Sequence, residues 1–208
     1  MVKELYIVRH GQTDYNLKKI VQGSGVDASL NENGRAQAAA FYEAYKNEGF
    51  DKIYVSDLRR TLESVQQFID DGIHYERLSG LNEISWGARE GVPFNEETNK
   101  YYYSVLEKWQ QGHTTLPVEG GESPEEVASR QKEAMQYIMS QIHEKKVLIC
   151  MHGRAMRILL AHLFNYPLSV MDVFEHQNLG LYKLKATGDQ YQLLDYNEAS
   201  HLVDFTPA

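Results

Sequence analysis

One short segment of the chain, Arg9-His10-Gly11, combines residue types that can transfer a phosphoryl group. A histidine at the end of a buried strand can act as a nucleophile, and a glycine beside it lets the backbone approach a ligand closely. Arginine binds phosphate oxygens in a bidentate manner, so Arg9 and Arg60 are candidates for that contact. By itself, the segment fits equally well a histidine that bonds to a carbonyl group and an arginine that reaches solvent.

The elements that must position these residues alternate along the chain. Short apolar runs, typical of strands, occupy 5–8, 52–55, 73–78, 146–151, 179–184 and 191–196. Helical spacing of apolar residues occupies 35–46, 58–69, 127–142 and 156–163. Ser123 and Pro124, with Glu126 three residues after the serine, are typical of a helix start. The alternation predicts an α/β three-layer sandwich with a mostly parallel central β-sheet flanked by helices.

Two of the predicted strands end in the same dipeptide, His10-Gly11 and His152-Gly153, and a third ends at Ser56. In open α/β sheets, ligands bind beyond the carboxyl ends of the strands, so these ends are where a site is expected. A histidine after an apolar strand is often a hydrogen-bonded core residue, but the glycine that follows His152 favours a role in the site.

Length, composition and charge limit the kinds of protein that can hold this site. The chain has 208 residues, 42% hydrophobic and 24% charged, without repeats or linkers, which predicts one domain over 1–208. The net charge of -8 disfavours nucleic acid as a partner, although arginines in one cleft can still attract a small anion. The lone Cys150 and the lack of an apolar run of about 20 residues favour a cytoplasmic protein without a membrane partner.

Two other phosphatase and hydrolase chemistries lack their residues. A cysteine-based phosphatase needs an arginine six positions after its cysteine, and Met156 stands at that distance from Cys150. The sequence has no HExxH or CxxC spacing for zinc and no glycine-rich Walker loop. We therefore expect a reaction with no metal and no cofactor.

Several segments, taken in order, resemble the histidine phosphatase superfamily, the phosphoglycerate-mutase-like proteins. The segment VRHGQTDYN over 8–16 is similar to the signature of this superfamily. The others are Gln22-Gly23 with Asp27, Leu30, Gly34 and Gln37 after it, SDLRR over 56–60, LNEISWGAREG over 81–91, and GGES over 120–123 with CMHG over 150–153. The resemblance covers nearly the whole chain, which is identified as a member.

The resemblance implies roles for individual residues. His10 would attack phosphorus and become a phosphohistidine, while Arg9, Arg60 and His152 would surround the transferred group. Glu83 would donate a proton to the leaving oxygen; outside this segment it would be read as a solvated surface carboxylate. Substrate-binding positions implied in the same way are Asn16, Gln22, Gly23, Gly153 and Arg154.

Four further residues are left with open roles. Thr13 either contacts phosphate or caps a turn, and Arg157 is expected to pair with a carboxylate. His176 and Asn178 precede a strand and are candidates for the edge of the site.

The segment 91–121 lacks a clear period and is rich in tyrosine, with Trp109. We expect it to form either a lid that packs on an organic leaving group or a cover over the core. It contains no arginine, two lysines (Lys100 and Lys108) and the glutamates Glu96, Glu97, Glu107 and Glu119. That charge disfavours a bisphosphoglycerate partner.

The segment therefore favours the phosphatase branch, including fructose-2,6-bisphosphatase-like members, over a cofactor-dependent phosphoglycerate mutase. The expected function is hydrolysis of a small phosphorylated metabolite. The mutase reaction is the alternative, and an inactive relative that binds a phosphorylated ligand is a weaker one, because His10, Arg60, Glu83 and His152 are all present. A sugar phosphate, a nucleotide, α-ribazole phosphate and a phosphoprotein stay open as substrates, as does the oligomeric state.

Overall fold

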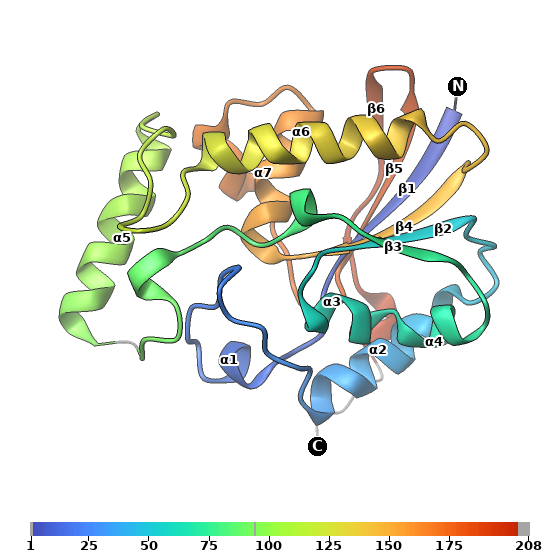
Figure 1. Cartoon of the computed structure of the whole chain (residues 1–208), viewed down its shortest axis with the longest axis horizontal. Helices are drawn as coiled ribbons and strands as arrows, with labels where there is room; N and C mark the ends of the chain where they lie inside the picture. The colour runs from blue at the N-terminus through green and yellow to red at the C-terminus, as the bar shows by residue number, and fades with distance from the viewer. Residues whose placement is uncertain (1, 94, 204–208) are drawn as a thin grey trace.

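A six-stranded sheet forms the centre of the computed structural model, which describes residues 2–93 and 95–203. The strand order is β3-β2-β4-β1-β5-β6 (Figure 1). The first four strands run parallel to one another, and β5 is antiparallel to both of its neighbours. The strands are β1 (Val2–Arg9), β2 (Lys52–Val55), β3 (Tyr75–Arg77), β4 (Lys146–Met151), β5 (Leu181–Thr187) and β6 (Gln190–Glu198).

Helices cover both faces of this sheet, so the predicted three-layer sandwich is confirmed. Figure 1 places α6 above the sheet and α2, α3 and α4 below it. The helices are α1 (Asp14–Leu17), α2 (Glu32–Tyr45), α3 (Arg59–Ser64), α4 (Gln66–Asp70), α5 (Glu96–Gln110), α6 (Pro124–Ser140) and α7 (Gly153–Leu163). Short 3-10 turns are η1 (Ser79–Leu81), η2 (Gly87–Arg89), η3 (Leu168–Val173) and η4 (Ser200–Leu202).

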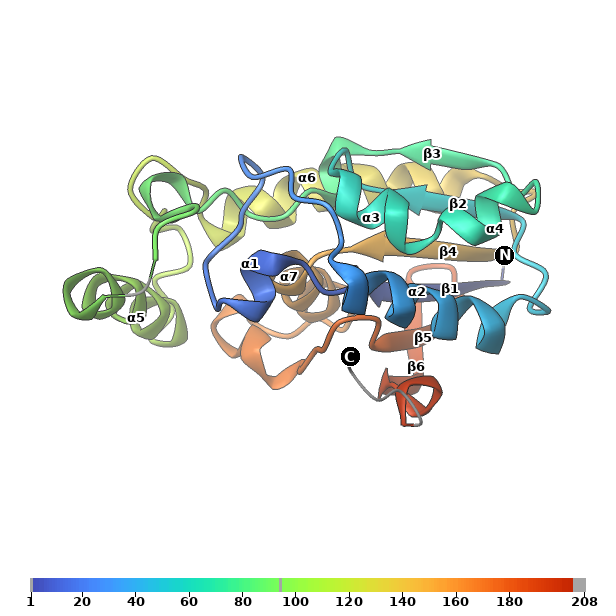
Figure 2. The same cartoon turned by 90° about the horizontal axis from the view of Figure 1, so that it is seen from below.

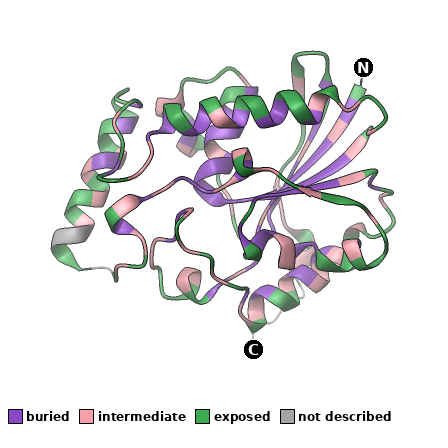
Figure 3. Ribbon diagram, in the orientation of Figure 1, coloured by how far each residue is buried: buried purple, intermediate pink, exposed green. Residues whose placement is uncertain are grey.

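Alternate side chains of the central strands build two separate apolar cores. Leu5 and Ile7 of β1 pack on the side of α6 and α7, whereas Tyr6 and Val8 pack on the side of α2 and α4. This is the alternation that a strand buried on both faces must show. Figure 3 shows the central strands buried and the outer helix surfaces exposed.

The register of the central pair brings two strand ends together. Arg9, the last residue of β1, pairs with Met151, the last residue of β4, and the His10 N–H donates to the Met151 carbonyl at 3.0 Å. The residues that follow both strands, His10 and His152, therefore start side by side.

Two predicted helix boundaries were wrong. The pattern over 58–69 predicted one helix, but the structure breaks it at Val65 into α3 and α4. At that point the Ser64 hydroxyl donates to the Arg60 carbonyl at 2.6 Å, a bond that competes with the helix ladder. The other error is Ile142, which was placed on the buried face of a helix but lies beyond the end of α6 and is 58% exposed.

The segment 91–121 holds a helix that the sequence interpretation missed. α5 has 15 residues, and Tyr102, Val105, Leu106 and Trp109 recur on one face at helical spacing. Trp109 is fully buried and packs on Trp86, so this part of the segment covers the core. Figures 1 and 2 place α5 at the end of the molecule opposite the N-terminus. Residue 94 of the segment lies outside the described residues.

None of the helices over 2–93 and 95–203 combines the length and the apolar character needed to cross a membrane.

Candidate active site

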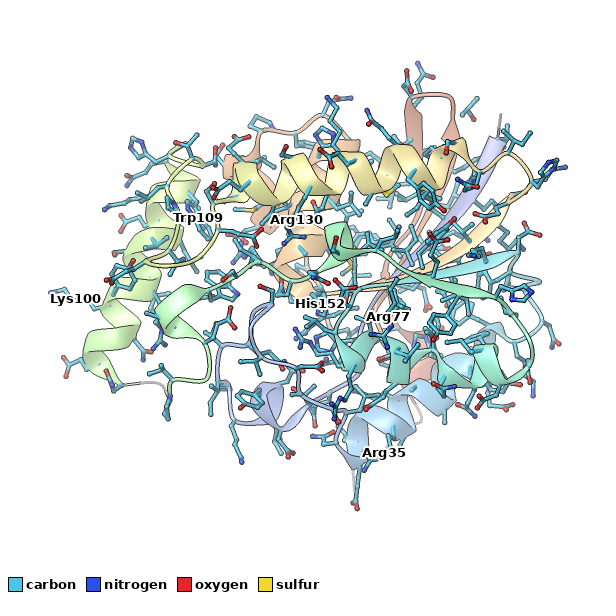
Figure 4. The ribbon with its side chains drawn as sticks, in the orientation of Figure 1. Arg35, Arg77, Lys100, Trp109, Arg130 and His152 are labelled. Carbon is cyan, nitrogen blue, oxygen red and sulfur yellow. The ribbon has the colours of Figure 1, made fainter. Side chains whose placement is uncertain are left out.

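A cavity of about 290 Å³ opens at the carboxyl ends of β1 and β4. Figure 4 shows His152 near the middle of the molecule, where β4 meets α7. The loops that follow β1 and β4 form part of the cavity wall, together with the segment after η1 and one face of α5. The cavity is lined by Arg9, His10, Asn16, Ile20, Val21, Gln22, Glu83, Trp86, Tyr102, Gly153, Arg154, Arg157 and His176.

His10 has the tautomer that a nucleophile requires. Its Nδ1 lies 2.7 Å from the Gly11 carbonyl oxygen, which can only accept, so Nδ1 carries the proton and Nε2 keeps its lone pair. The residue is 2% exposed. Burial, with the nearby charges of Arg60 and Arg9, holds the pKa of His10 well below its ordinary value. The imidazole is therefore neutral at neutral pH.

Gly11 is required for a reason other than ligand approach. A Cβ there would sit 2.7 Å from the backbone oxygen of Gly34 in α2, which is closer than a carbon atom can come. The Gly11 N–H donates to the Ser64 hydroxyl at 2.8 Å. The glycine thus lets α2 pack against the loop that carries His10, where the sequence interpretation expected a ligand.

His152 has both ring nitrogens engaged by protein. The Arg60 Nε–H donates to its Nδ1 at 3.2 Å, so the proton is on Nε2, which lies 2.8 Å from the Ser56 hydroxyl. The ring is fully buried, and its centroid is 5.2 Å from that of His10. Burial and the charge of Arg60 hold the pKa of His152 well below its ordinary value. His152 is close to His10 but is not among the residues that line the cavity.

The two predicted phosphate-binding arginines occupy different depths. Arg9 lines the cavity, and its Nε is buried without a hydrogen-bond partner in the described residues. Arg60 is fully buried behind the lining, where it donates to the Val26 carbonyl at 2.6 Å and to the Gly23 carbonyl at 3.2 Å. Burial lowers the pKa of each to about 10, so both stay charged at neutral pH. Gly23 accordingly holds Arg60 and does not line the cavity.

Glu83 is buried at the start of α7, although a lone glutamate is usually a surface residue. Its Oε1 accepts from the Ala155 N–H at 2.8 Å, and its Oε2 accepts from the Arg154 N–H at 3.1 Å. The side chain is 7% exposed and lines the cavity. Free backbone N–H groups at a helix N-terminus attract a carboxylate, which explains its position opposite the strand ends.

Amide side chains hold the loop that follows β1. The Asn16 Oδ1 accepts from the Thr13 N–H at 3.1 Å and from the Asn178 amide at 3.2 Å, which leaves the Asn16 amide nitrogen for a ligand. Gln22 donates to the Thr13 hydroxyl at 2.8 Å. Thr13 is the N-cap of α1, so its capping interpretation holds. Asn178 also donates to the His10 carbonyl at 2.9 Å and stays behind the lining.

Gly153 gives room to a histidine. A Cβ at Gly153 would lie 2.6 Å from the His176 ring, so only glycine allows this ring to enter the cavity. Burial lowers the pKa of His176 to about 2, with contributions from Arg9 and Arg157, so the imidazole is neutral. The sequence identified His176 only as a residue before a strand.

One part of the cavity wall is aromatic and basic. Arg154 lies about 6.0 Å from the Trp86 ring centroid and 5.9 Å from that of Trp109. Arg154 and Arg157 both donate to the Oδ1 of Asp172 in η3, each at 2.5 Å. The carboxylate expected for Arg157 is therefore Asp172, which the sequence interpretation missed because no local pattern marks it.

The site combines a neutral imidazole, guanidinium groups that can bind phosphate oxygens, and a carboxylate. Such a set can transfer a phosphoryl group. In the described residues, no cluster of three or more His, Cys, Asp or Glu side chains is arranged to hold a metal ion. Cys150 is buried, and burial raises the pKa of its thiol.

Comparison with known proteins agrees with this chemistry. The model of the histidine phosphatase superfamily (branch 1) matches residues 5–199. The uncharacterized phosphatase PhoE of Bacillus subtilis (strain 168) is 28% identical over 201 residues, 96% of each chain. A 2,3-bisphosphoglycerate-dependent phosphoglycerate mutase of Brucella ovis is 30% identical over 174 residues, 78% of this chain and 82% of the mutase.

Two solved structures share the fold over nearly their full length. Bacillus stearothermophilus YhfR is 27% identical with a TM-score of 0.85, covering 96% of this chain and 99% of that one. Mycobacterial glucosyl-3-phosphoglycerate phosphatase Rv2419c, solved with VO3, is 26% identical with a TM-score of 0.82, covering 94% and 98%.

Proposed function

The chain belongs to the histidine phosphatase superfamily (branch 1), and from that premise we propose that it hydrolyses phosphomonoesters through a phosphohistidine on His10. One observation carries the proposal. The Gly11 carbonyl accepts a hydrogen bond from the His10 Nδ1–H, so a neutral imidazole keeps the Nε2 lone pair for attack in the cavity.

In the first step the His10 Nε2 attacks phosphorus, a P–N bond forms, and the P–O bond to the leaving alcohol breaks. Glu83 acts as the general acid and gives a proton to the departing oxygen. Arg9 binds the phosphoryl oxygens directly from the lining, while Asn16 and Gln22 donate amide hydrogen bonds without adding charge. Arg60 and His152 act from behind: the guanidinium supplies positive field, and the imidazole holds it in place.

In the second step water replaces the alcohol. Glu83, now ionised, takes a proton from the water as its oxygen attacks phosphorus, and the P–N bond breaks. His10 leaves as the neutral imidazole that began the cycle, and inorganic phosphate departs. The same carboxyl serves both steps because leaving alcohol and incoming water occupy the same side of the phosphorus.

Hydrolysis fits the site better than a mutase reaction. Among the described residues that line the cavity none is a lysine, and Lys100 and Lys108 are exposed on α5. The two arginines beyond the phosphoryl site already share a carboxylate, Asp172. Asp172 therefore offsets part of the positive charge there, which disfavours a bisphosphorylated intermediate. The relatives named above include two phosphatases, which agrees with this choice.

The test is release of inorganic phosphate from a panel of phosphomonoesters, near neutral and at mildly acidic pH, with His10→Ala as the control. The panel includes a sugar phosphate, a nucleotide, α-ribazole phosphate, a phosphopeptide, and 3-phosphoglycerate with and without 2,3-bisphosphoglycerate. We expect release that His10→Ala abolishes, and acid-labile phosphate on the wild-type chain only. Isomerisation of 3-phosphoglycerate with little free phosphate would establish the mutase reaction instead, and ligand binding without phosphohistidine would establish a binding protein.

A further inference from the structure

The Asp172 carboxylate accepts hydrogen bonds from two arginines of the cavity lining, Arg154 and Arg157. Its Oδ1 accepts from the Nη1 of both Arg154 and Arg157, while its Oδ2 accepts from Gln110 of α5 at 3.3 Å. Three separate elements, η3, α5 and α7, thus meet at this side chain. Burial raises the pKa of Asp172, but the two guanidinium groups outweigh burial and hold it below its ordinary value, so Asp172 is ionised.

Both arginines line the cavity, and the proposed mechanism assigns the phosphoryl oxygens to Arg9 and to the Asn16 and Gln22 amides. Left without Asp172, they would form a pair of guanidinium groups on the wall that a leaving group faces. Such a pair is a ready site for a carboxylate or a second phosphate, because guanidinium groups bind planar anions with parallel hydrogen bonds. Asp172 presents to them the same group that such a substrate would bring.

We propose that Asp172 determines substrate specificity by accepting an Nη1 hydrogen bond from each of Arg154 and Arg157 and offsetting part of their charge, so that the site selects phosphomonoesters whose leaving group carries no charge. The proposal rests on the proposed function, because the phosphoryl group must occupy the His10 end. It names the substrate class for that site, which leaves sugar and polyol phosphates favoured over phosphorylated acids and bisphosphates. A second anion must displace Asp172 or bind beside it, and both cost affinity.

The arginines would keep their places if the charge of Asp172 were removed. The Arg154 Cζ lies 6.0 Å from the Trp86 ring centroid and 5.9 Å from that of Trp109, and the Arg157 Nε–H donates to the Phe174 carbonyl at 3.0 Å. An asparagine at position 172 has the shape of aspartate and can still accept from one guanidinium through its oxygen. Asp172→Asn therefore changes the charge of the wall with little change in its shape.

The experiment uses two ligands that differ in one group. Glycerol 3-phosphate and 3-phosphoglycerate share a three-carbon phosphomonoester, but the second has a carboxylate where the first has a hydroxymethyl group. We would measure Kd for both by calorimetry on the full chain carrying His10→Ala, which cannot turn them over, with and without Asp172→Asn. The expected result is that Asp172→Asn tightens 3-phosphoglycerate by about tenfold and changes glycerol 3-phosphate by less than about twofold.

Three further variants separate charge from structure. Asp195→Asn removes one charge from the exposed face of β6 and should leave both Kd values unchanged. Asp172→Glu keeps the charge and should keep the wild-type ratio of the two Kd values. Adding Arg157→Gln to Asp172→Asn restores the local charge and should return the ratio toward that of the wild type.

Several results would overturn the proposal. These are an unchanged Kd ratio in Asp172→Asn, weakening of both ligands alike, and an equal shift in Asp195→Asn. Failure of the proposed function has a different signature: no His10-dependent phosphate release from glycerol 3-phosphate, whatever the Kd ratio. A shifted ratio in a chain that releases no phosphate would support the role of Asp172 and refute hydrolysis.

Discussion

The carboxyl ends of β1 and β4 present the same dipeptide in two different states. Both end in histidine followed by glycine, both imidazoles are buried and neutral, and the rings are 5.2 Å apart. His10 gives one nitrogen to a carbonyl group and keeps the other for the cavity, whereas His152 gives both nitrogens to protein, to Arg60 and Ser56. The partner of the second nitrogen, and not the dipeptide, separates a nucleophile from a residue that positions an arginine.

The glycines differ in the same way. Gly11 admits the backbone of α2, which closes the space behind His10, whereas Gly153 admits the side chain of His176 into the cavity. Each glycine removes a Cβ that would clash, but one contact is structural and the other adds a polar group to the site. The two ends can therefore be tested against each other by substitutions matched in type.

The largest effect is expected from replacing each histidine with glutamine. His10→Gln should lower kcat by about 10⁴-fold or more, because no nucleophile replaces the imidazole, while His152→Gln should lower it by about 10²-fold. Acid-labile phosphate measured in quenched reactions should vanish in the first variant and persist in the second. Equal losses in kcat, or a phosphoenzyme in His10→Gln, would erase the distinction between the two strand ends.

The next largest effect is expected from replacing Glu83, the proposed proton donor, which lies at the β4 end of the cavity. Glu83→Gln should lower kcat by about 10³-fold for an alkyl phosphate but only about tenfold for p-nitrophenyl phosphate, whose leaving group needs no proton. Steady-state kinetics on both substrates measure the difference. Glu133→Gln, exposed on α6, is the matched control and should leave both rates unchanged. A loss independent of the leaving group would assign Glu83 to the support of α7 alone.

Ser56→Ala should have a smaller effect. It removes the acceptor of the His152 Nε2–H, so the imidazole keeps only its hydrogen bond from Arg60 and holds that guanidinium less firmly. We expect kcat/KM to fall by about tenfold, with a loss of about 1 kcal/mol in the free energy of unfolding. Kinetics, urea denaturation and ¹⁵N chemical shifts of the His152 ring measure the three consequences. Ser104→Ala on α5 is the control, and unchanged ¹⁵N shifts in Ser56→Ala would contradict the hydrogen bond assigned to the His152 Nε2–H.

The smallest effect on activity is expected from His176, whose contribution is to pH dependence. Its pKa is about 2 in the fold and about 6.5 in the unfolded chain, so below pH 6.5 only the unfolded chain takes up this proton. Stability is therefore complete above that pH and falls, by about 1.4 kcal/mol per pH unit from this residue, as the solution is acidified.

His176→Asn removes this contribution, while His10 and His152 contribute in the same direction to both chains. Urea denaturation at pH 7.5 and pH 5.0 should show a shallower loss of the free energy of unfolding in His176→Asn than in the wild type. Identical slopes would mean that the His176 ring titrates in the folded protein as it does in the unfolded chain.

Much of the fold was predictable because its signals are local. A run such as 5–8 is apolar throughout because β1 is buried on both faces, and the Ser123 cap is confirmed by its bond with the Glu126 N–H. α5 was predictable in principle, since Tyr102, Val105 and Trp109 have helical spacing, but exposed tyrosines on either side of Tyr102 obscured the period. The break between α3 and α4 at Val65 was not predictable, because the apolar spacing continues across it. Beside the break, the Ser64 hydroxyl donates to the Arg60 carbonyl.

The candidate site divides in the same way. His10, His152 and Arg60 are identifiable from the strand ends and from the order of the segments along the chain. Glu83 could be named only through the resemblance, because its burial depends on α7, which begins 70 residues later. Asp172 had no signal at all, since its only distinguishing feature is the pair of arginines that the fold brings to it.

The sequence by itself determined which residues stand at the strand ends, because apolar periodicity and a following glycine are properties of neighbours in the chain. Only the tertiary structure decided what those residues can do. The tautomer of His152 depends on Arg60, 92 residues away, and the charge left on Arg154 and Arg157 depends on Asp172. Proton positions and net charge are set by partners in space, and burial gives those partners their strength because water no longer competes for the same hydrogen bonds.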